Sequence, residues 1–298
     1  MYLPVQMGHA IHPGIGYIGD DTGENISERN GNFCELTGLY WAAKNLDSDY
    51  IGIVHYRRYF ASRLHRFERK KRRVIGHEEL NAILATTNVV LPKERHYFIE
   101  TNYTQYIHAH HEQDLRVTRA IIERKCPEYL PAYDTYMSKT HGHHFNMFVM
   151  KKELLQHYCT WLFDILFELE KELDISSYST NDKRVFGFVS ERLLDAWLIT
   201  NNIAYEELLH DHGTLAIGNG HDGAVGDNVV IAFGVGAASA LAFPAAGSQQ
   251  VSWHGFTIKV FLPLVGHNAA SSAHCSSDKS HNDPPISGAG RARPILCR

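Results

Sequence analysis

A short segment in the first fifth of the chain combines residue types that bind anions. Residues 50–54 (YIGIV) are apolar and rich in β-branched side chains, which predicts a buried strand. His55, Tyr56, Arg57 and Arg58 follow directly. Open α/β sheets bind ligands outside the carboxyl ends of their strands, and guanidinium groups form paired hydrogen bonds with phosphate oxygens. The segment therefore predicts an anion site at a strand end, with a solvated cationic edge as the ordinary alternative.

Two polar loops supply further candidate binding residues. Residues 20–27 (DDTGENIS) include Asp21 and Asn25 and have a turn-forming composition, so they could hold a ligand or cap a helix. A later loop contains Tyr97 and Glu100 within a mixed aromatic and polar set that seldom serves packing alone. We expect both loops to contribute to a binding site.

Glu191 is the carboxylate best placed to act as a general base. It falls in the first half of a helix predicted over residues 184–201, next to Arg192. A helix start stabilises a carboxylate as the anion, which is the form that accepts a proton. The alternative is an exposed helical residue with no catalytic role.

Histidine is abundant, with 20 in the chain, and two clusters stand out. Residues 108–111 lie on a predicted helix, and residues 141–144 precede an apolar strand predicted over 145–150. Neither cluster has the HExxH pattern or another recognised zinc spacing. We therefore expect polar packing or hydrogen bonds to a substrate and no metal ligands, with a histidine-based metal hydrolase as the last alternative.

Charge and composition exclude several classes of protein. The formal net charge of -4 argues against nucleic acid as a partner. No P-loop, GxGxxG or GxSxG motif occurs, and the five cysteines form no CxxC pair, which suits a reducing compartment. One basic run, residues 65–73 (HRFERKKRR), is either a solvated loop or a surface for anionic headgroups or an anionic substrate. With no apolar span or leader, the chain is expected in the cytoplasm.

The order of predicted elements indicates an α/β fold. Asn32 and Glu35 have the spacing of a capping box, so a helix is expected to begin near Phe33 and to lead into the strand at 50–54. Residues 152–173 form the most clearly amphipathic predicted helix. From about residue 210 the composition shifts to Gly, Ala, Ser and His, so we expect residues 210–298 to be a poorly ordered appendage.

Several long motifs, in order, resemble one bacterial family of capsular and exopolysaccharide biosynthesis proteins. They are YLPVQMG (2–8), DDTGENISERNGNFCELTGLYWAAKN (20–45), DYIGIVHYRRYF (49–60), FIETNYTQYIHAHHEQDL (98–115), HHFNMFVMKKELLQHYCTWLFDILFELE (143–170) and RVFGFVSERLLDAWL (184–198). The family is similar to glycosyltransferases of the GT-A type, with relatives that resemble galactofuranosyltransferases using a UDP-linked sugar. The resemblance implies a Rossmann-type central sheet flanked by helices over residues 1–209. It also implies that a first strand normally precedes residue 2, so the fold is expected to be truncated at its N-terminus.

The resemblance implies a donor site without an obligatory metal. In GT-A folds the strand matching residues 50–54 normally ends in an Asp-x-Asp motif that holds a divalent metal on the diphosphate. Here that place reads His55-Tyr56-Arg57-Arg58, so guanidinium charge is expected to neutralise the leaving diphosphate. Asp21 and Asn25 are expected to complete the donor site. A divalent metal remains an open alternative.

The resemblance also implies an acceptor site and an inverting mechanism. Glu191 falls where inverting GT-A enzymes often place their base, and residues 145–150 match the strand beneath the acceptor. The expected acceptor-binding residues are Tyr97, Glu100, His144, Asn146 and Arg192.

The function implied is transfer of a sugar, with galactofuranose as a candidate, from a UDP-sugar to a lipid-linked oligosaccharide acceptor. Such an enzyme would work in the cytoplasm or at the inner face of the cell membrane. The alternative is a non-catalytic carbohydrate-binding or assembly protein of the polysaccharide machinery.

Overall fold

The computed structural model describes residues 2–55, 58–65, 74–212, 229–235, 252–253 and 256–257. Tyr56, Arg57 and the basic residues 66–73 therefore lie outside the described residues. The chain divides into two units, Met1–Ser248 and Gln249–Arg298. In the second unit, β12 (Ser252–Trp253) pairs with β13 (Phe256–Thr257) in antiparallel fashion.

The first unit is built on a mixed β-sheet with the order β2-β1-β11-β3-β8-β5-β9, to which β4 and β10 add at one end of β3. Its strands are β1 (Tyr2–Gln6), β2 (Ile18–Gly19), β3 (Tyr50–His55), β4 (Arg58–Phe60), β5 (Val89–Pro92), β8 (Phe148–Lys151), β9 (Glu206–Leu208), β10 (His210–His212) and β11 (Val229–Val235). The pairs β1–β2 and β5–β9 are parallel, whereas β11, β8 and β4 all pair with β3 in antiparallel fashion. A separate antiparallel pair joins β6 (Arg95–His96) to β7 (His141–Gly142).

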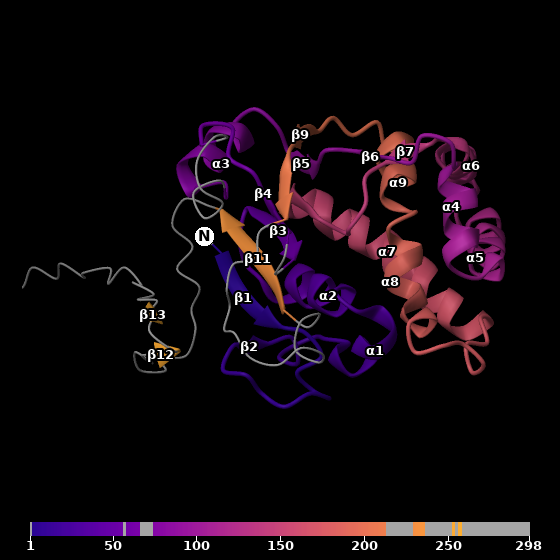
Figure 1. Cartoon of the computed structure of the whole chain (residues 1–298), viewed down its shortest axis with the longest axis horizontal. Helices are drawn as coiled ribbons and strands as arrows, with labels where there is room; N and C mark the ends of the chain where they lie inside the picture. The colour runs from indigo at the N-terminus through magenta and orange to yellow at the C-terminus, as the bar shows by residue number, and fades with distance from the viewer. Residues whose placement is uncertain are drawn as a thin grey trace, which may run out of the picture. The chain divides into compact units, whose positions relative to one another are not determined.

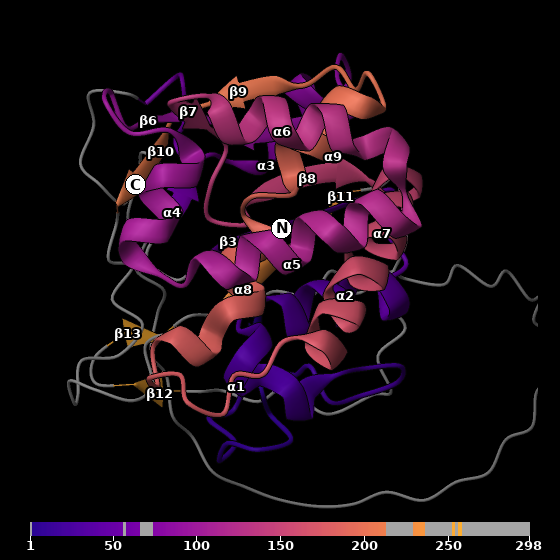
Figure 2. The same ribbon diagram turned by 90° about the vertical axis from the view of Figure 1, so that its right-hand side faces the viewer.

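Helices cover this sheet on both faces (Figure 1). They are α1 (Asn30–Phe33), α2 (Leu36–Asn45), α3 (His77–Leu84), α4 (Asn102–Ala109), α5 (Glu112–Lys125), α6 (Leu130–Ser138), α7 (Lys152–Glu172), α8 (Val185–Ser190) and α9 (Leu194–Thr200). Short 3-10 turns lie at Ser27–Arg29, Pro127–Tyr129 and Asp182–Arg184. Helices α4 to α6 lie in front in Figure 2. Among the described residues, no helix is both long and apolar enough to cross a bilayer.

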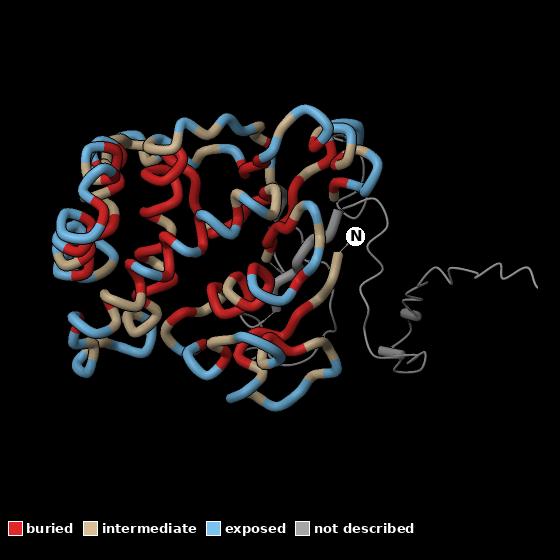
Figure 3. Tube along the Cα trace, turned by 180° about the vertical axis from the view of Figure 1, so that it is seen from behind, coloured by how far each residue is buried: buried red, intermediate tan, exposed pale blue. Residues whose placement is uncertain are grey.

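The alternation of side chains along β3 explains its central position. Ile51 and Ile53 point into a large core shared with α2, α7 and the other helices, while Val54 points into a smaller core that includes Leu80 and Leu84 of α3. All three β3 side chains are at most 1% exposed. Figure 3 shows this burial running through the sheet and the inner sides of the helices. The predicted buried strand is confirmed, and so is the α/β class with helices flanking a central sheet.

Helix α7 confirms the predicted amphipathic helix. Leu155, Leu162, Leu166 and Leu169 recur at helical spacing and are fully buried. Replacing one such leucine by alanine typically costs about 2–5 kcal/mol of folding free energy, because a cavity is left behind. The helix packs against β3 and β8 of the sheet, and α2 and α5 pack against the helix.

Three predictions of local structure were wrong. The capping box at Asn32 and Glu35 does not form, because Cys34 adopts a left-handed conformation (φ 52°) that separates α1 from α2. The helix expected over residues 184–201 is interrupted between Ser190 and Leu194. The strand expected over 145–150 begins only at Phe148, because the two residues at 145 and 146 also have positive φ.

The tail also contributes to the sheet. β10 pairs with β4, and β11 lies between β1 and β3, antiparallel to both. The domain boundary expected at residue 209 stays a prediction, although these two strands from beyond it pair within the main sheet.

Candidate functional site

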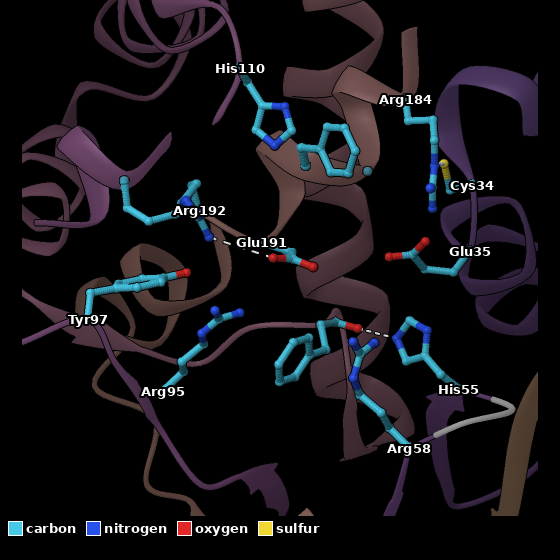
Figure 4. Close-up of a pocket in the computed structure, with 14 residues that line it drawn as sticks. Cys34, Glu35, His55, Arg58, Arg95, Tyr97, His110, Arg184, Glu191 and Arg192 are labelled. Atoms are coloured by element: carbon cyan, nitrogen blue, oxygen red, sulfur yellow. Dashed lines mark hydrogen bonds and ion pairs between the residues drawn. The ribbon is translucent and has the colours of Figure 1, made fainter. Parts of the chain in front are cut away.

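A pocket opens where β3 ends, lined by residues from many separate elements (Figure 4). Its volume of about 370 Å³ is in the range of sites for small molecules. The lining residues are Cys34, Glu35, His55, Arg58, Arg95, Tyr97, Gln105, His110, Phe145, Arg184, Gly187, Phe188, Glu191 and Arg192. The site is therefore assembled by tertiary structure, with β3, β4, β6, α4, α8 and the loops beside them each supplying one or a few groups.

Arg58 and Arg95 of the pocket lie against aromatic rings, and neither forms an ion pair with a carboxylate of the described residues. The Arg58 guanidinium carbon lies 4.2 Å from the centre of the Phe145 ring, and that of Arg95 lies 5.0 Å from the centre of the Tyr97 ring. Figure 4 shows both guanidinium groups turned toward the pocket. Arg58 Nε is buried without a hydrogen-bond partner in the described part of the chain. A cation held on an aromatic face keeps its N–H groups available for an anion.

Glu191 is ionised by the charges around it. Its Oε2 lies 3.6 Å from Arg192 and 3.7 Å from Nδ1 of His144. Burial alone would raise the pKa of Glu191, but His144, Arg192 and His55 together hold that pKa below its ordinary value. The prediction that a helix start stabilises this carboxylate was wrong, because Glu191 follows the last residue of α8. The basic groups beside Glu191 lower the pKa of its carboxyl, and no helix start contributes.

His144 and Arg192 form a buried pair behind Glu191. Arg192 donates to Nδ1 of His144 over 2.6 Å and to Oε1 of Gln105 over 2.6 Å. Since a guanidinium can only donate, Nδ1 of His144 accepts and the ring proton resides on Nε2. Burial lowers the pKa of His144, which agrees with a neutral ring. Within the described residues, Nε2 of His144 and Nε of Arg192 are buried without a hydrogen-bond partner.

A second carboxylate, Glu35, faces Glu191 across the pocket (Figure 4). Its Oε1 accepts a hydrogen bond of 2.7 Å from the amide of Asn146, which also donates to the Gly187 carbonyl and accepts from Ser190. Sequence reasoning missed Glu35 because its spacing from Asn32 had the form of a helix cap. The unusual backbone at Cys34, which turns Glu35 toward the pocket, carries no sequence signal, since cysteine has no preference for positive φ.

Phe145 and Asn146, both with positive φ, contact residues on opposite sides of the pocket. Phe145 has φ 77° and Asn146 has φ 48°. The Phe145 carbonyl accepts a short hydrogen bond from Nε2 of His55, while its ring supports Arg58. Consecutive non-glycine residues in this region cost about 1–3 kcal/mol each and persist only where the surroundings impose them.

The pocket gathers some of the predicted site residues and leaves others outside. His55, Arg58, Tyr97, Glu191 and Arg192 line it. His144 and Asn146 lie directly behind it, where they hold Arg192 and Glu35.

Three other predicted residues do not line the pocket. Asp21 pairs with His9 over 2.7 Å, the Asn25 amide closes its own turn onto the Asp21 and Gly23 carbonyls, and Glu100 pairs with His108 over 2.5 Å. The predicted residues Tyr56 and Arg57 lie outside the described residues. Arg95, Gln105, His110 and Arg184 were not predicted individually, because only the fold brings them to the end of β3.

The described residues contain no group of three or more His, Cys, Asp or Glu side chains arranged to hold a metal ion. Both carboxylates of the pocket contact donor groups of the protein, Glu35 at Asn146 and Glu191 at Arg192.

Comparison with known proteins places the chain in a family. A solved structure described as the apo form of the bifunctional glycosyltransferase WbbM is similar to it, with a TM-score of 0.63 and 32% sequence identity. The similarity covers 69% of this chain and 41% of that chain, so this chain spans less than half of the solved protein, and its mixed α/β sheet flanked by helices is GT-A-like. The comparison with curated protein sequences gave no match. A family model described as a domain of unknown function, DUF4422, matches residues 1–202, and the chain belongs to this glycosyltransferase-related family.

Proposed function

We propose that the chain is an inverting glycosyltransferase that moves a sugar from a UDP-sugar to a lipid-linked oligosaccharide during capsular or exopolysaccharide synthesis. Galactofuranose is the sugar we would test first. Similarity to a glycosyltransferase supports glycosyl transfer in general. One observation carries the proposal: Arg58 and Arg95, whose guanidinium groups have no carboxylate partner among the described residues, share a pocket with the carboxylate of Glu191, whose pKa is lowered.

In this proposal the donor diphosphate binds at the β3 end of the pocket. Arg58 and Arg95 donate to its oxygens, and Arg57 joins them from the adjacent position in sequence. As the bond between the anomeric carbon and the diphosphate breaks, UDP leaves with the electron pair and the guanidinium groups stabilise the added charge. Because this charge is matched by protein cations, catalysis requires no divalent metal.

The acceptor hydroxyl approaches from the side of Tyr97 and Arg192. Its oxygen attacks the anomeric carbon while its proton passes to Glu191, which is ionised at neutral pH as glutamate ordinarily is and whose pKa is lowered further by its basic neighbours. Arg192, itself held by His144, pairs with that carboxylate, and Asn146 fixes Glu35 opposite. Attack from the face opposite the leaving group inverts the anomeric configuration.

The experiment that tests this function is a screen of UDP-sugars with the purified chain, reading released UDP with and without oligosaccharide acceptors. We expect one UDP-sugar to be turned over, and EDTA to leave the rate within about twofold since arginine supplies the positive charge. Loss of activity in EDTA with recovery in Mn²⁺ would contradict the metal-free mechanism. No turnover of any UDP-sugar, together with no binding of UDP, would contradict the function itself.

A non-catalytic carbohydrate-binding role is the second candidate. It is favoured by Phe98 and Ile99, which follow the pocket residue Tyr97 and are 87% and 94% exposed. Exposed aromatic and aliphatic groups at a pocket rim suit contact with a glycan or with the surface of the inner membrane. Titration calorimetry separates the candidates, because a glycan-binding protein would take up the oligosaccharide but not UDP.

A further inference from the structure

His143 lies fully buried between two carboxylates outside the pocket. Its Nδ1 is 2.6 Å from Oδ1 of Asp195, and its Nε2 is 3.2 Å from Oε1 of Glu207. Its backbone N–H also donates to Oδ2 of Asp195 over 2.8 Å. A neutral imidazole can donate from only one ring nitrogen, whereas both nitrogens here face acceptors. The arrangement therefore suits the doubly protonated imidazolium.

The segment that begins at His143 carries the contacts that organise the pocket. His144 receives the hydrogen bond of Arg192, Phe145 supports Arg58 and binds His55 through its carbonyl, and Asn146 holds Glu35. The strained backbone at Phe145 and Asn146 would relax if nothing held it. His143 ties the start of this segment to α9 through Asp195 and to β9 through Glu207.

We propose that His143 is a positioning residue whose imidazolium, clamped between Asp195 and Glu207, holds residues 143–146 in the strained shape that the pocket needs. When the imidazolium loses a proton, one of the two clamping hydrogen bonds is lost and the segment loosens. The role of His143 adds to the proposed glycosyltransferase function. Of the two measurements below, only UDP release depends on that function; hydrogen exchange does not.

The charges around His143 favour its protonated form. Burial alone would lower its pKa, but the hydrogen bond to Asp195 and the negative charges of Asp195, Glu94 and Glu207 raise it above the ordinary value. The other neighbour is Tyr205, whose ring meets the imidazole edge to face at 5.0 Å. Arg63, from the segment after β4, reaches β9, where it donates to the Glu207 carbonyl and pairs with Glu206. The facing groups are thus mainly acidic.

The direction of the pH effect follows from this raised pKa. A group that binds its proton more tightly in the clamped state stabilises that state fully below its unclamped pKa, near 6.5 for histidine. As pH rises from there toward the raised pKa, opening of the segment becomes about tenfold more favourable for each pH unit. The pocket should therefore lose its shape on the alkaline side.

Glu207→Gln is the decisive variant. Oε1 of Glu207 faces both Nε2 of His143 and the backbone N–H of Glu94, which donates to it over 3.1 Å. In the glutamine variant an amide nitrogen at this place can donate to an unprotonated Nε2 of His143, with loss of the hydrogen bond from Glu94. The neutral imidazole is then clamped as well, so the alkaline loss should disappear. Glu206→Gln is the matched control, because it makes the same change on the neighbouring residue of β9, whose side chain pairs with Arg63.

The test measures hydrogen exchange of the peptide covering residues 143–149 from pH 6 to 9, corrected for intrinsic rates, together with UDP release. We expect protection to fall by about tenfold per pH unit in wild type and Glu206→Gln over the window set by the pKa of His143, and to stay flat in Glu207→Gln. UDP release should follow the same pattern. Protection that is flat in wild type, or equally pH-dependent in Glu207→Gln, would overturn the clamp. If exchange follows the prediction but no UDP-sugar is turned over, the clamp stands and the proposed function falls.

Discussion

Two polar regions that the sequence marks as candidate sites differ in how their polar groups are satisfied. In the loop before α1, Asp20 is fully buried and accepts from the backbone N–H groups of Gly8 and His9 and from the hydroxyls of Ser27 and Thr37, at 2.5–3.1 Å. In the pocket, by contrast, the Nε atoms of Arg58 and Arg192 are buried without a hydrogen-bond partner within the described residues. A buried polar group without a partner costs free energy unless something else binds it. The Asp20 carboxylate is thus fully used by the protein itself, whereas the pocket offers donors to a ligand, as the proposed function requires.

Among the changes that test this contrast, replacing Glu191, the proposed base, is expected to lower the rate of transfer most. Glu191→Gln keeps the size of the side chain and removes its proton acceptor, so transfer should fall by about 10³-fold with little change in UDP affinity. Steady-state kinetics with separate kcat and KM values measures this. Glu35→Gln is the matched change on the opposite carboxylate. If it abolishes turnover while Glu191→Gln does not, Glu35 is the base.

The next largest effect is expected at the donor end. Arg58→Ala removes a cation that should stabilise the leaving diphosphate, so transfer should fall by about 10²-fold and UDP affinity should weaken. The double variant with Arg57→Ala should have no measurable transfer. Arg119→Ala serves as control, because Arg119 is exposed and pairs with Asp134 over 2.7 Å away from the pocket. Wild-type turnover in the double variant would remove the diphosphate site from the proposal.

Replacing Asp20 should lower the stability of the fold and leave transfer nearly unchanged, in contrast to the changes in the pocket. Asp20→Ala leaves two hydroxyls and two backbone N–H groups without their acceptor, so the free energy of unfolding should drop by about 2–4 kcal/mol. Urea denaturation gives this value. Transfer per folded molecule should stay within about twofold of wild type, since none of the four donors lines the pocket. A selective loss of UDP binding in a fully folded variant would show that this loop also belongs to the site.

The smallest effect is expected at Asp21, the residue beside Asp20 that was predicted to bind the donor. Its pair with His9 is about one third exposed on each side, so Asp21→Ala should change the free energy of unfolding by less than about 1 kcal/mol. UDP affinity should be unchanged in calorimetry. A tenfold weaker affinity of Asp21→Ala for UDP would show that Asp21 does belong to the donor site.

Helices and strands could be predicted from the sequence where a run of neighbouring residues determines them. The β-branched run of β3 and the leucine spacing of α7 were sufficient to predict a buried strand and an amphipathic helix. The arginines that follow β3 were predicted to form an anion site, because strand ends form the ligand-binding edge of such sheets. Arg58 lines the pocket, and anion binding there stays a prediction. Long ordered motifs additionally identified the family.

The remaining features depend on tertiary contacts. The break between α8 and α9 at Glu191 coincides with the burial of Arg192 against His144 and Gln105, partners 48 and 87 residues away along the chain. Likewise, Glu35 reaches the pocket only because Cys34 adopts a left-handed backbone. Neither feature follows from helix propensity or spacing, so sequence reasoning extended the helix through Glu191 and assigned Glu35 to a cap.

The most direct test of the central claim is titration calorimetry of UDP into the wild-type protein and Arg58→Ala, each in EDTA. We expect wild type to bind UDP in a single site without metal and Arg58→Ala to bind at least about tenfold more weakly, the weakening expected when one charged hydrogen-bond donor is removed. Equal affinity in the two proteins, or binding in wild type that appears only when Mn²⁺ is added, would contradict a pocket in which arginine holds the diphosphate.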